Sequence, residues 1–316
     1  MRNQLSGQRG WARPATLSRN TTLTDVLARL AHPHRPPLAG ADREDDHDPS
    51  LDSGHMELRG TSVLVTGATG GLGQAIARRL AGEGCALTLT GRRADALEPV
   101  AAEVGATALV ADLSVADDVA RVARTDVDIL VANAALPGAG ELESFSVEQI
   151  DRVLDVNLRA PIMLARQLGE RMLARGRGHV VLISSLSGKS ATPVSSLYNA
   201  TKFGLRGFAL ALRQDWEPLG VGVSCVNPGP IADAGMFHEG GGELPKGVRP
   251  RTPADVADAV VRAIRANRAE VDVADPVMRA GAWFSLLAPQ TTARLARFGG
   301  TEKVARQLAE GHADNR

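Results

Sequence analysis

The sequence contains only two cysteines, Cys85 and Cys225, in 316 residues. Each lies in a short apolar run that is typical of a buried strand, so both are interpreted as small core residues in a reducing compartment. Two isolated cysteines exclude a fold stapled by disulfides and a cysteine-rich metal centre, and no metal site is expected.

An excess of charge and long apolar runs are also missing. The 36 basic and 36 acidic residues cancel, which excludes recruitment of nucleic acid by bulk electrostatics. No uninterrupted apolar stretch approaches the roughly 20 residues that span a bilayer. We therefore expect a soluble, cytoplasmic protein.

The composition of residues 1–55 differs from that of the rest of the chain. They hold five of the 17 prolines and four of the seven histidines, with an arginine-rich first part and an acidic second part. This charge-block pattern predicts a disordered extension, in which His32, His34 and His47 are solvated and do not bind metal. Two alternatives remain open: an organellar transit peptide, or a segment outside the functional protein, since Met56 precedes the first strand.

From residue 61 onward, apolar runs of strand length alternate with amphipathic stretches of helix length. This alternation is typical of a parallel sheet covered on both faces. It predicts an α/β fold, a doubly wound parallel sheet in three α/β/α layers, over residues 56–275, followed by a C-terminal helical extension over 276–316. The predicted strands are 61–66, 85–90, 107–111, 129–132, 179–183, 221–226 and 270–273, and the predicted helices are 72–81, 94–104, 115–123, 147–174, 197–212 and 253–266.

A glycine-rich turn, T-G-A-T-G-G-L-G, connects the first predicted strand to the first predicted helix. Gly67, Gly71 and Gly73 let the backbone turn sharply and approach a pyrophosphate, while the helix N-terminus supplies oriented N–H groups. The spacing differs from G-x-G-x-x-G, so the position between strand and helix is what favours dinucleotide binding over a plain turn.

The end of the second predicted strand distinguishes between the two nicotinamide dinucleotides. A carboxylate there binds the ribose 2′-hydroxyl of NAD, but this sequence has Gly91 followed by Arg92 and Arg93. An arginine fork matches a phosphate dianion. The sequence therefore favours NADP(H), with NAD(H) as the alternative cofactor.

Tyr198 is the only tyrosine, and Lys202, one of four lysines, follows it by four residues. On a helix over 197–212 the two side chains share one face. A neighbouring ammonium stabilises a phenolate, so we expect the pKa of Tyr198 to fall and the phenol to exchange a proton near neutral pH. Ser185 follows a predicted buried strand, and its hydroxyl is a candidate for holding a substrate oxygen beside the phenol.

This combination of motifs resembles the short-chain dehydrogenase/reductase family, which has a Rossmann fold, over residues 57 to about 275. T-G-x-x-x-G-x-G, Y-x-x-x-K and N-P-G are matched, whereas N-N-A-G appears as A-N-A-A, and Asp233 replaces the common threonine after N-P-G. The resemblance implies a catalytic set of Asn157, Ser185, Tyr198 and Lys202. It implies cofactor contacts from Gly67, Thr69, Gly71, Leu72, Gly73, Arg92, Asp112, Leu113, Asn133, Tyr198, Lys202, Pro228, Gly229 and Ile231.

The roles implied by the resemblance are those of a hydride-transfer enzyme. Tyr198 is the general acid or base, Ser185 holds the substrate oxygen, Lys202 also binds the nicotinamide ribose, and Asn157 orders a water that relays protons. Segment 232–251 falls where the family has its substrate lid, although a passive surface loop has the same pattern. Segment 277–298 is interpreted as a subunit contact, with a substrate entrance and a membrane-surface element as the less favoured alternatives.

The function predicted on this basis is an NADP-dependent oxidoreductase that interconverts a small, apolar ketone or aldehyde and an alcohol, as a homodimer or homotetramer. One alternative is a 3-oxoacyl-thioester reductase, for which Lys246, Arg249 and Arg251 offer a basic patch near the lid. The other is a non-catalytic protein that senses a nucleotide. Intact Ser185 and Tyr198 argue against the sensor, which needs neither.

Overall fold

The computed structural model describes residues 56–241, 249–298, 306–307 and 310–311. The predicted disordered extension and its histidines lie outside the described residues. Within the described part, no helix combines the length and the apolar character needed to cross a membrane. Both cysteines are free thiols.

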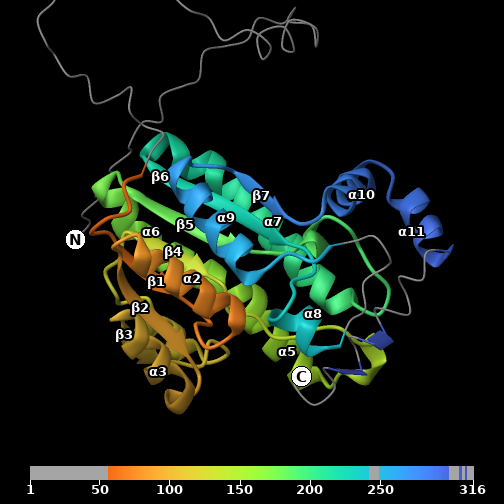
Figure 1. Cartoon of the computed structure of the whole chain (residues 1–316), viewed down its shortest axis with the longest axis horizontal. Helices are drawn as coiled ribbons and strands as arrows, with labels where there is room; N and C mark the ends of the chain where they lie inside the picture. Colours follow the sequence, from red (N-terminus) through yellow and green to blue (C-terminus); the bar gives the residue numbers. More distant parts are fainter. Residues whose placement is uncertain (1–55, 242–248, 299–305, 308–309, 312–316) are drawn as a thin grey trace, which may run out of the picture. The chain divides into compact units, whose positions relative to one another are not determined.

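Seven parallel strands form one sheet in the order β3-β2-β1-β4-β5-β6-β7 (Figure 1). The order reverses between β1 and β4, where a doubly wound sheet opens a crevice at the carboxyl ends of its strands. All seven predicted strands are present, so the predicted α/β fold class is confirmed. The strands are β1 (Ser62–Val65), β2 (Ala86–Gly91), β3 (Thr107–Val110), β4 (Ile129–Ala132), β5 (Gly178–Ile183), β6 (Val221–Pro228) and β7 (Glu270–Val273).

Helices cover both faces of the sheet. Successive residues of a strand point to opposite faces, and Val63 of β1 packs into one core whereas Leu64 packs into the other. Both faces of the central strands are thus buried, which explains why those strands are mainly apolar. One face carries α2 (Gly71–Gly82), α3 (Ala94–Val104) and α9 (Pro253–Arg265), and the other carries α4 (Ala116–Val122), α6 (Ala160–Arg175) and α7 (Ser196–Trp216).

The long helix predicted over 147–174 is interrupted, which corrects the prediction. Helix α5 (Val147–Leu154) ends in a π turn, Asp155–Arg159, before α6 begins. Ala160 donates its N–H to the carbonyl of Asp155, five residues back, and Pro161 has no N–H to continue an α-helical ladder. Such single-turn bulges inside helices are frequent at functional sites.

Two further helices follow β7, and a short one lies in the predicted lid segment. They are α10 (Pro276–Leu287), α11 (Pro289–Phe298) and α8 (Gly235–Glu239). The lack of periodicity in 232–251 hid α8, because a helix of five residues is too short to show a repeat. The division into domains at residues 55 and 275 stays a prediction.

The buried His179 of β5 makes the stability of the fold sensitive to acid. Its Nε2 lies 2.8 Å from Ser224 Oγ, and burial lowers its pKa to about 3. The unfolded chain, with an ordinary histidine pKa near 6.5, binds more protons between those two values. The free energy of unfolding therefore falls as the pH drops below 6.5, by up to about 1.4 kcal/mol per pH unit from this group.

Replacement of His179 by leucine is expected to remove this contribution. Ser224 retains the Arg268 carbonyl as an acceptor at 2.5 Å, so the substitution leaves no buried hydroxyl unpaired. Urea unfolding between pH 7 and pH 5 is expected to show a flatter loss of stability for His179→Leu than for wild type. Equal slopes for the two proteins would contradict the assignment.

Candidate active site

A cavity of about 790 Å³ opens at the carboxyl ends of the strands, where β1 and β4 diverge. The glycine turn after β1, the end of β2, the Ser185 segment after β5, α7 and the N-P-G turn after β6 all line it. Of the predicted site residues, the cavity is lined by Gly67, Thr69, Gly71, Leu72, Gly73, Arg92, Asp112, Leu113, Asn133, Ser185, Tyr198, Lys202, Pro228, Gly229 and Ile231.

The glycine turn has no room for side chains. Gly67 has a positive φ of 65°, and a Cβ added to it would lie 2.7 Å from Ala134 Cα. A Cβ on Gly73 would overlap the Gly67 carbonyl oxygen and lie 2.8 Å from Ala68 Cα. The start of α2 thus packs directly against the backbone of the turn, and its N-terminus faces the cavity.

Asn133 holds the same turn from β4. Its Nδ2 donates to the carbonyls of Thr66 and Gly67, each at 3.1 Å, and its own N–H donates to Thr66 Oγ1 at 3.0 Å. The Asn133 side chain thereby fixes the end of β1 relative to β4. The departures from the family motif at Ala132 and Ala135 leave these bonds intact.

The end of β2 contains a buried hydroxyl without a partner. Thr90 Oγ1 has no hydrogen-bond partner among the described residues, and Thr90 lines the cavity beside Arg92. An unpaired buried hydroxyl costs about 1–3 kcal/mol, so a polar ligand group is expected here. Together with the glycine turn, these residues fit the adenosine and pyrophosphate parts of a dinucleotide.

Arg92 and Asp112 lie on this half of the cavity. Arg92 is exposed, and no hydrogen bond or ion pair to another described residue engages its guanidinium. Asp112 Oδ1 accepts from Ser114 N at 2.9 Å and from Ser114 Oγ at 2.7 Å, and Arg152 contacts Oδ2 at 3.3 Å. Burial raises the pKa of Asp112, but these bonds outweigh it and the net pKa is lowered, so the carboxylate is ionised.

Ser185 and Tyr198 face each other across the cavity floor. Ser185 Oγ accepts from Ser187 N at 3.1 Å and donates to the Pro228 carbonyl at 3.3 Å, and Ser185 lies close enough to the Tyr198 hydroxyl to lower its pKa, against the larger effect of burial. The backbone N–H of Tyr198 donates to Gly138 O at 3.2 Å. This last bond fixes the start of α7 relative to the loop that follows β4.

Lys202 lies one turn further along α7, as the sequence predicts. It is 3% exposed, its Nζ donates to the Ile183 carbonyl at 3.0 Å, and Nζ lies 5.6 Å from the centroid of the Tyr198 ring. Burial lowers the pKa of Lys202 to about 8.

The expected fall in the phenol pKa is wrong for the protein without a ligand. Burial raises the pKa of Tyr198 to about 12, and the hydrogen bond with Ser185 only partly opposes this. The Lys202 ammonium is engaged by a carbonyl and lies beside the ring, so desolvation of the phenolate outweighs attraction to the cation. The phenol is therefore fully protonated at neutral pH.

Asn157 lies in the π turn and does not reach the cavity. It is 1% exposed, and its amide binds the backbone of Leu136 twice: Oδ1 accepts from the N–H at 2.6 Å and Nδ2 donates to the carbonyl at 2.9 Å. Leu136 itself lines the cavity. Asn157 thus shapes one wall through the Leu136 segment.

Backbone contacts and one left-handed residue define the loop that follows β6. Gly229 N–H donates to Val273 O at 2.9 Å, and buried Ile231 forms a bridge with Arg251. Asp233 adopts a left-handed conformation with φ of 62°, which is uncommon outside glycine. The next residue, Ala234, packs closely against Gly71. A Cβ added to Gly71 would overlap the Ala234 methyl.

Two groups of residues around the site escaped the sequence analysis. One face of α10 lines the cavity through Met278, Ala282 and Ser285, whereas the sequence analysis named no residue of this segment as part of the site. Lys189 is fully buried four residues after Ser185. In a chain with four lysines, its position between the two main motifs was a usable signal.

Several known proteins are similar to this chain over more than half of its length. Residues 61–241 match the family model for short chain dehydrogenase. Nodulation protein G of Rhizobium is 40% identical over 57% of this chain and 76% of its own length. The ketoacyl reductase HetN of Nostoc is 34% identical over 68% of this chain and 79% of its own. A solved short-chain dehydrogenase from Sphingobium yanoikuyae in complex with NADPH is 27% identical, with a TM-score of 0.65, covering 74% of this chain and 95% of that one.

Proposed function

Because the chain belongs to the short-chain dehydrogenase/reductase family and is thus an NAD(P)-dependent oxidoreductase, we propose that it uses NADPH to reduce a small, apolar ketone or aldehyde. One observation carries the proposal: Ser185, Tyr198 and Lys202 line the same cavity as the glycine turn. Bound NADPH supplies the hydride. The protein supplies the proton and the geometry.

Tyr198 is the proposed general acid. With a pKa of about 12 its hydroxyl is protonated at neutral pH, which is the form that donates to an alkoxide forming at the substrate carbon. Ser185 lies beside the same phenol, so a carbonyl oxygen placed between the two hydroxyls accepts from both. Lys202, with its ammonium held at the Ile183 carbonyl, is placed to bind the nicotinamide ribose and to stabilise the phenolate left after proton transfer.

The substrate half of the cavity favours an uncharged molecule. Among the described residues, the charged side chains that line the cavity are Arg92, Asp112 and Lys202, and all three are assigned above to the cofactor. A charged substrate would lose its hydration here without gaining a partner. The remaining lining is mainly apolar, from Leu136, Pro137, Ala139, Leu186, Met236, Phe237, Met278 and Ala282.

The alternative, reduction of a 3-oxoacyl thioester, is supported by the ketoacyl reductase among the relatives. An apolar cavity also accommodates an acyl chain. Of the basic patch expected for such a substrate, Lys246 lies outside the described residues, and Arg251 donates to the Ala274 carbonyl at 3.5 Å. Homo-oligomerisation and a cytoplasmic location stay predictions.

Following NADPH absorbance with a panel of carbonyl compounds tests the proposed function. The panel contains aliphatic and aromatic ketones, an aldehyde and acetoacetyl-coenzyme A. We expect saturable NADPH consumption with an uncharged ketone or aldehyde. Faster turnover of the thioester would select the alternative, and no consumption with any member would overturn the enzymatic proposal.

Replacing Arg92 by alanine tests the cofactor preference. We expect NADPH affinity to fall about tenfold, the lower range for a charge-assisted phosphate contact at an exposed site, while NADH affinity stays unchanged. Fluorescence titration of the reduced cofactors measures both. Arg93→Ala is the matched control, because Arg93 is exposed next to Arg92 but does not line the cavity. Equal NADPH affinity in Arg92→Ala and wild type would contradict the assignment.

A further inference from the structure

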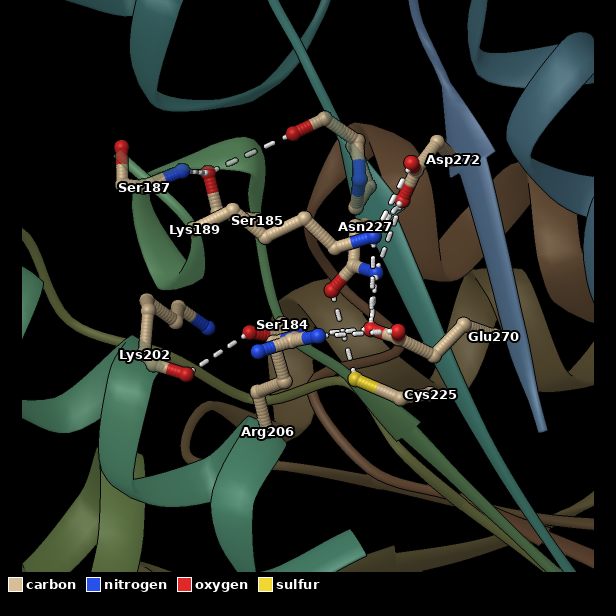
Figure 2. A network of polar contacts seen from close by, with 11 residues as sticks. Ser184, Ser185, Ser187, Lys189, Lys202, Arg206, Cys225, Asn227, Glu270 and Asp272 are labelled. Atoms are coloured by element: carbon tan, nitrogen blue, oxygen red, sulfur yellow. Dashed lines mark hydrogen bonds and ion pairs between the residues drawn. The ribbon is translucent and has the colours of Figure 1, made fainter. Parts of the chain in front are cut away.

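Lys189 lies at the centre of a buried ionic network behind the cavity (Figure 2). Its side chain is fully buried, and Nζ contacts both Asp272 oxygens, at 2.7 and 2.9 Å, and Glu270 Oε1 at 3.4 Å. A buried ammonium is retained only when its charge and its hydrogen bonds are satisfied. The two carboxylates of β7 provide this, so the position of Lys189 is tightly defined.

The same two carboxylates bind two other segments of the site. Arg206, one turn after Lys202 on α7, binds Glu270 at 2.7 and 3.0 Å. Asn227 of the N-P-G motif donates to Glu270 at 3.2 Å and to Asp272 at 2.9 Å. The segments that carry Ser185, Lys202 and Pro228 are therefore cross-linked through β7, as Figure 2 shows.

Helix α10 contacts the Lys189 segment directly. The Lys189 Nζ lies 4.5 Å from the centroid of the Trp283 ring, a cation–π contact. The next residue along, Ser190, is hydrogen-bonded with Ser285 at 2.8 Å. Both contacts join α10 to the Ser185 segment, and Ser285 lies on the face of α10 that lines the cavity together with Met278 and Ala282.

We propose that Lys189 is a positioning residue: held by Asp272 and Glu270 and stacked on Trp283, it sets the α10 wall of the substrate cavity at a fixed distance from Ser185. The inference rests on the proposed function, since it assigns the α10 face to the substrate. Lys189 is not among the described residues that line the cavity. Its effect reaches the reaction through the position of α10, so it governs substrate binding more than cofactor binding.

Variants of Trp283 test the proposal without disturbing the buried ion pairs. The ring is half-exposed, so Trp283→Leu is expected to fold. Loss of the cation–π contact is expected to raise KM for the best ketone of the panel by about threefold to thirtyfold, with the NADPH dissociation constant unchanged. Trp283→Phe retains a ring face and is expected to stay within about threefold of wild type.

Leu287→Ala is the matched control, because Leu287 lies on the same helix and is 84% exposed. Lys189→Met is the second variant, read by hydrogen exchange of residues 276–287, which needs no turnover. We expect faster exchange of α10 in Lys189→Met and in Trp283→Leu, and wild-type exchange in Leu287→Ala. An inactive wild type would overturn the proposed function. An active wild type with unchanged KM in Trp283→Leu, or unchanged α10 exchange in both variants, would overturn this inference alone.

Discussion

Tyr198→Phe is expected to lower kcat by about 10³-fold, within the range of 10²–10⁴ that a positioned general acid contributes. The substitution removes the only phenol in the chain and retains the ring that packs beside Lys202. Without the hydroxyl, the alkoxide that forms on reduction loses the acid that lies beside Ser185. Steady-state NADPH consumption with the best substrate of the panel measures the effect.

The binding of NADPH separates loss of chemistry from loss of structure in this variant. Tyr198 is fixed by its backbone N–H, which donates to Gly138 O, and the substitution leaves that bond in place. We expect the NADPH dissociation constant of Tyr198→Phe to stay within about threefold of wild type, a difference of less than 1 kcal/mol. If Tyr198→Phe still binds NADPH and its kcat lies within tenfold of the wild-type value, the assignment of Tyr198 as the acid is wrong.

Gly73→Ala is expected to weaken NADPH binding by about tenfold to a hundredfold. The added methyl would overlap the Gly67 carbonyl oxygen and press on Ala68 Cα at 2.8 Å, and both are backbone atoms that cannot move aside by a rotamer change. Forced overpacking of this kind typically costs about 1–3 kcal/mol, which here falls on the turn that approaches the pyrophosphate. Fluorescence titration with NADPH measures the change.

Gly82→Ala provides the control on the same helix. Gly82 ends α2, and a Cβ added there meets no atom within 4 Å. This substitution is expected to leave NADPH affinity unchanged and to alter stability by no more than about 1 kcal/mol. Equal NADPH affinity in Gly73→Ala and Gly82→Ala would contradict the role given to the glycine turn.

The sheet and the glycine turn were predictable because the information for them is local. Strands buried on both faces are mainly apolar, as β5 is from Val180 to Ile183, and this pattern is visible without knowing what packs against them. Gly67 and Gly73 stand at a fixed spacing between a strand and a helix. Backbone crowding at both positions admits only glycine.

The interruption at Asp155–Arg159 was not predictable from periodicity. The apolar positions of 147–174 repeat at helical spacing both before and after the π turn. Their pattern therefore does not reveal the one extra residue that the π turn contains. The direction in which the pKa of Tyr198 shifts was also predicted wrongly. The sequence places Lys202 on the correct face, but it contains no measure of how far burial removes water from the phenol, and burial decides the direction.

The α10 wall and the Lys189 network depend on contacts between distant segments. Lys189 and Asp272 are 83 residues apart, and Lys189 meets Trp283 further still along the chain. Nothing in the spacing of either motif indicates that β7 carries the two carboxylates that receive Lys189, Arg206 and Asn227. Only the pairing of β6 with β7 brings them together.

The most direct test of the account follows a deuterium label from cofactor to product. NADPH deuterated at the transferable position of its nicotinamide ring is incubated with the wild-type protein and the best ketone, and the alcohol is analysed by mass spectrometry and NMR. The account predicts one deuterium on the carbinol carbon with wild type and no labelled alcohol with Tyr198→Phe on the same time scale. Alcohol formed without the label, or labelled alcohol formed equally fast by both proteins, would contradict it.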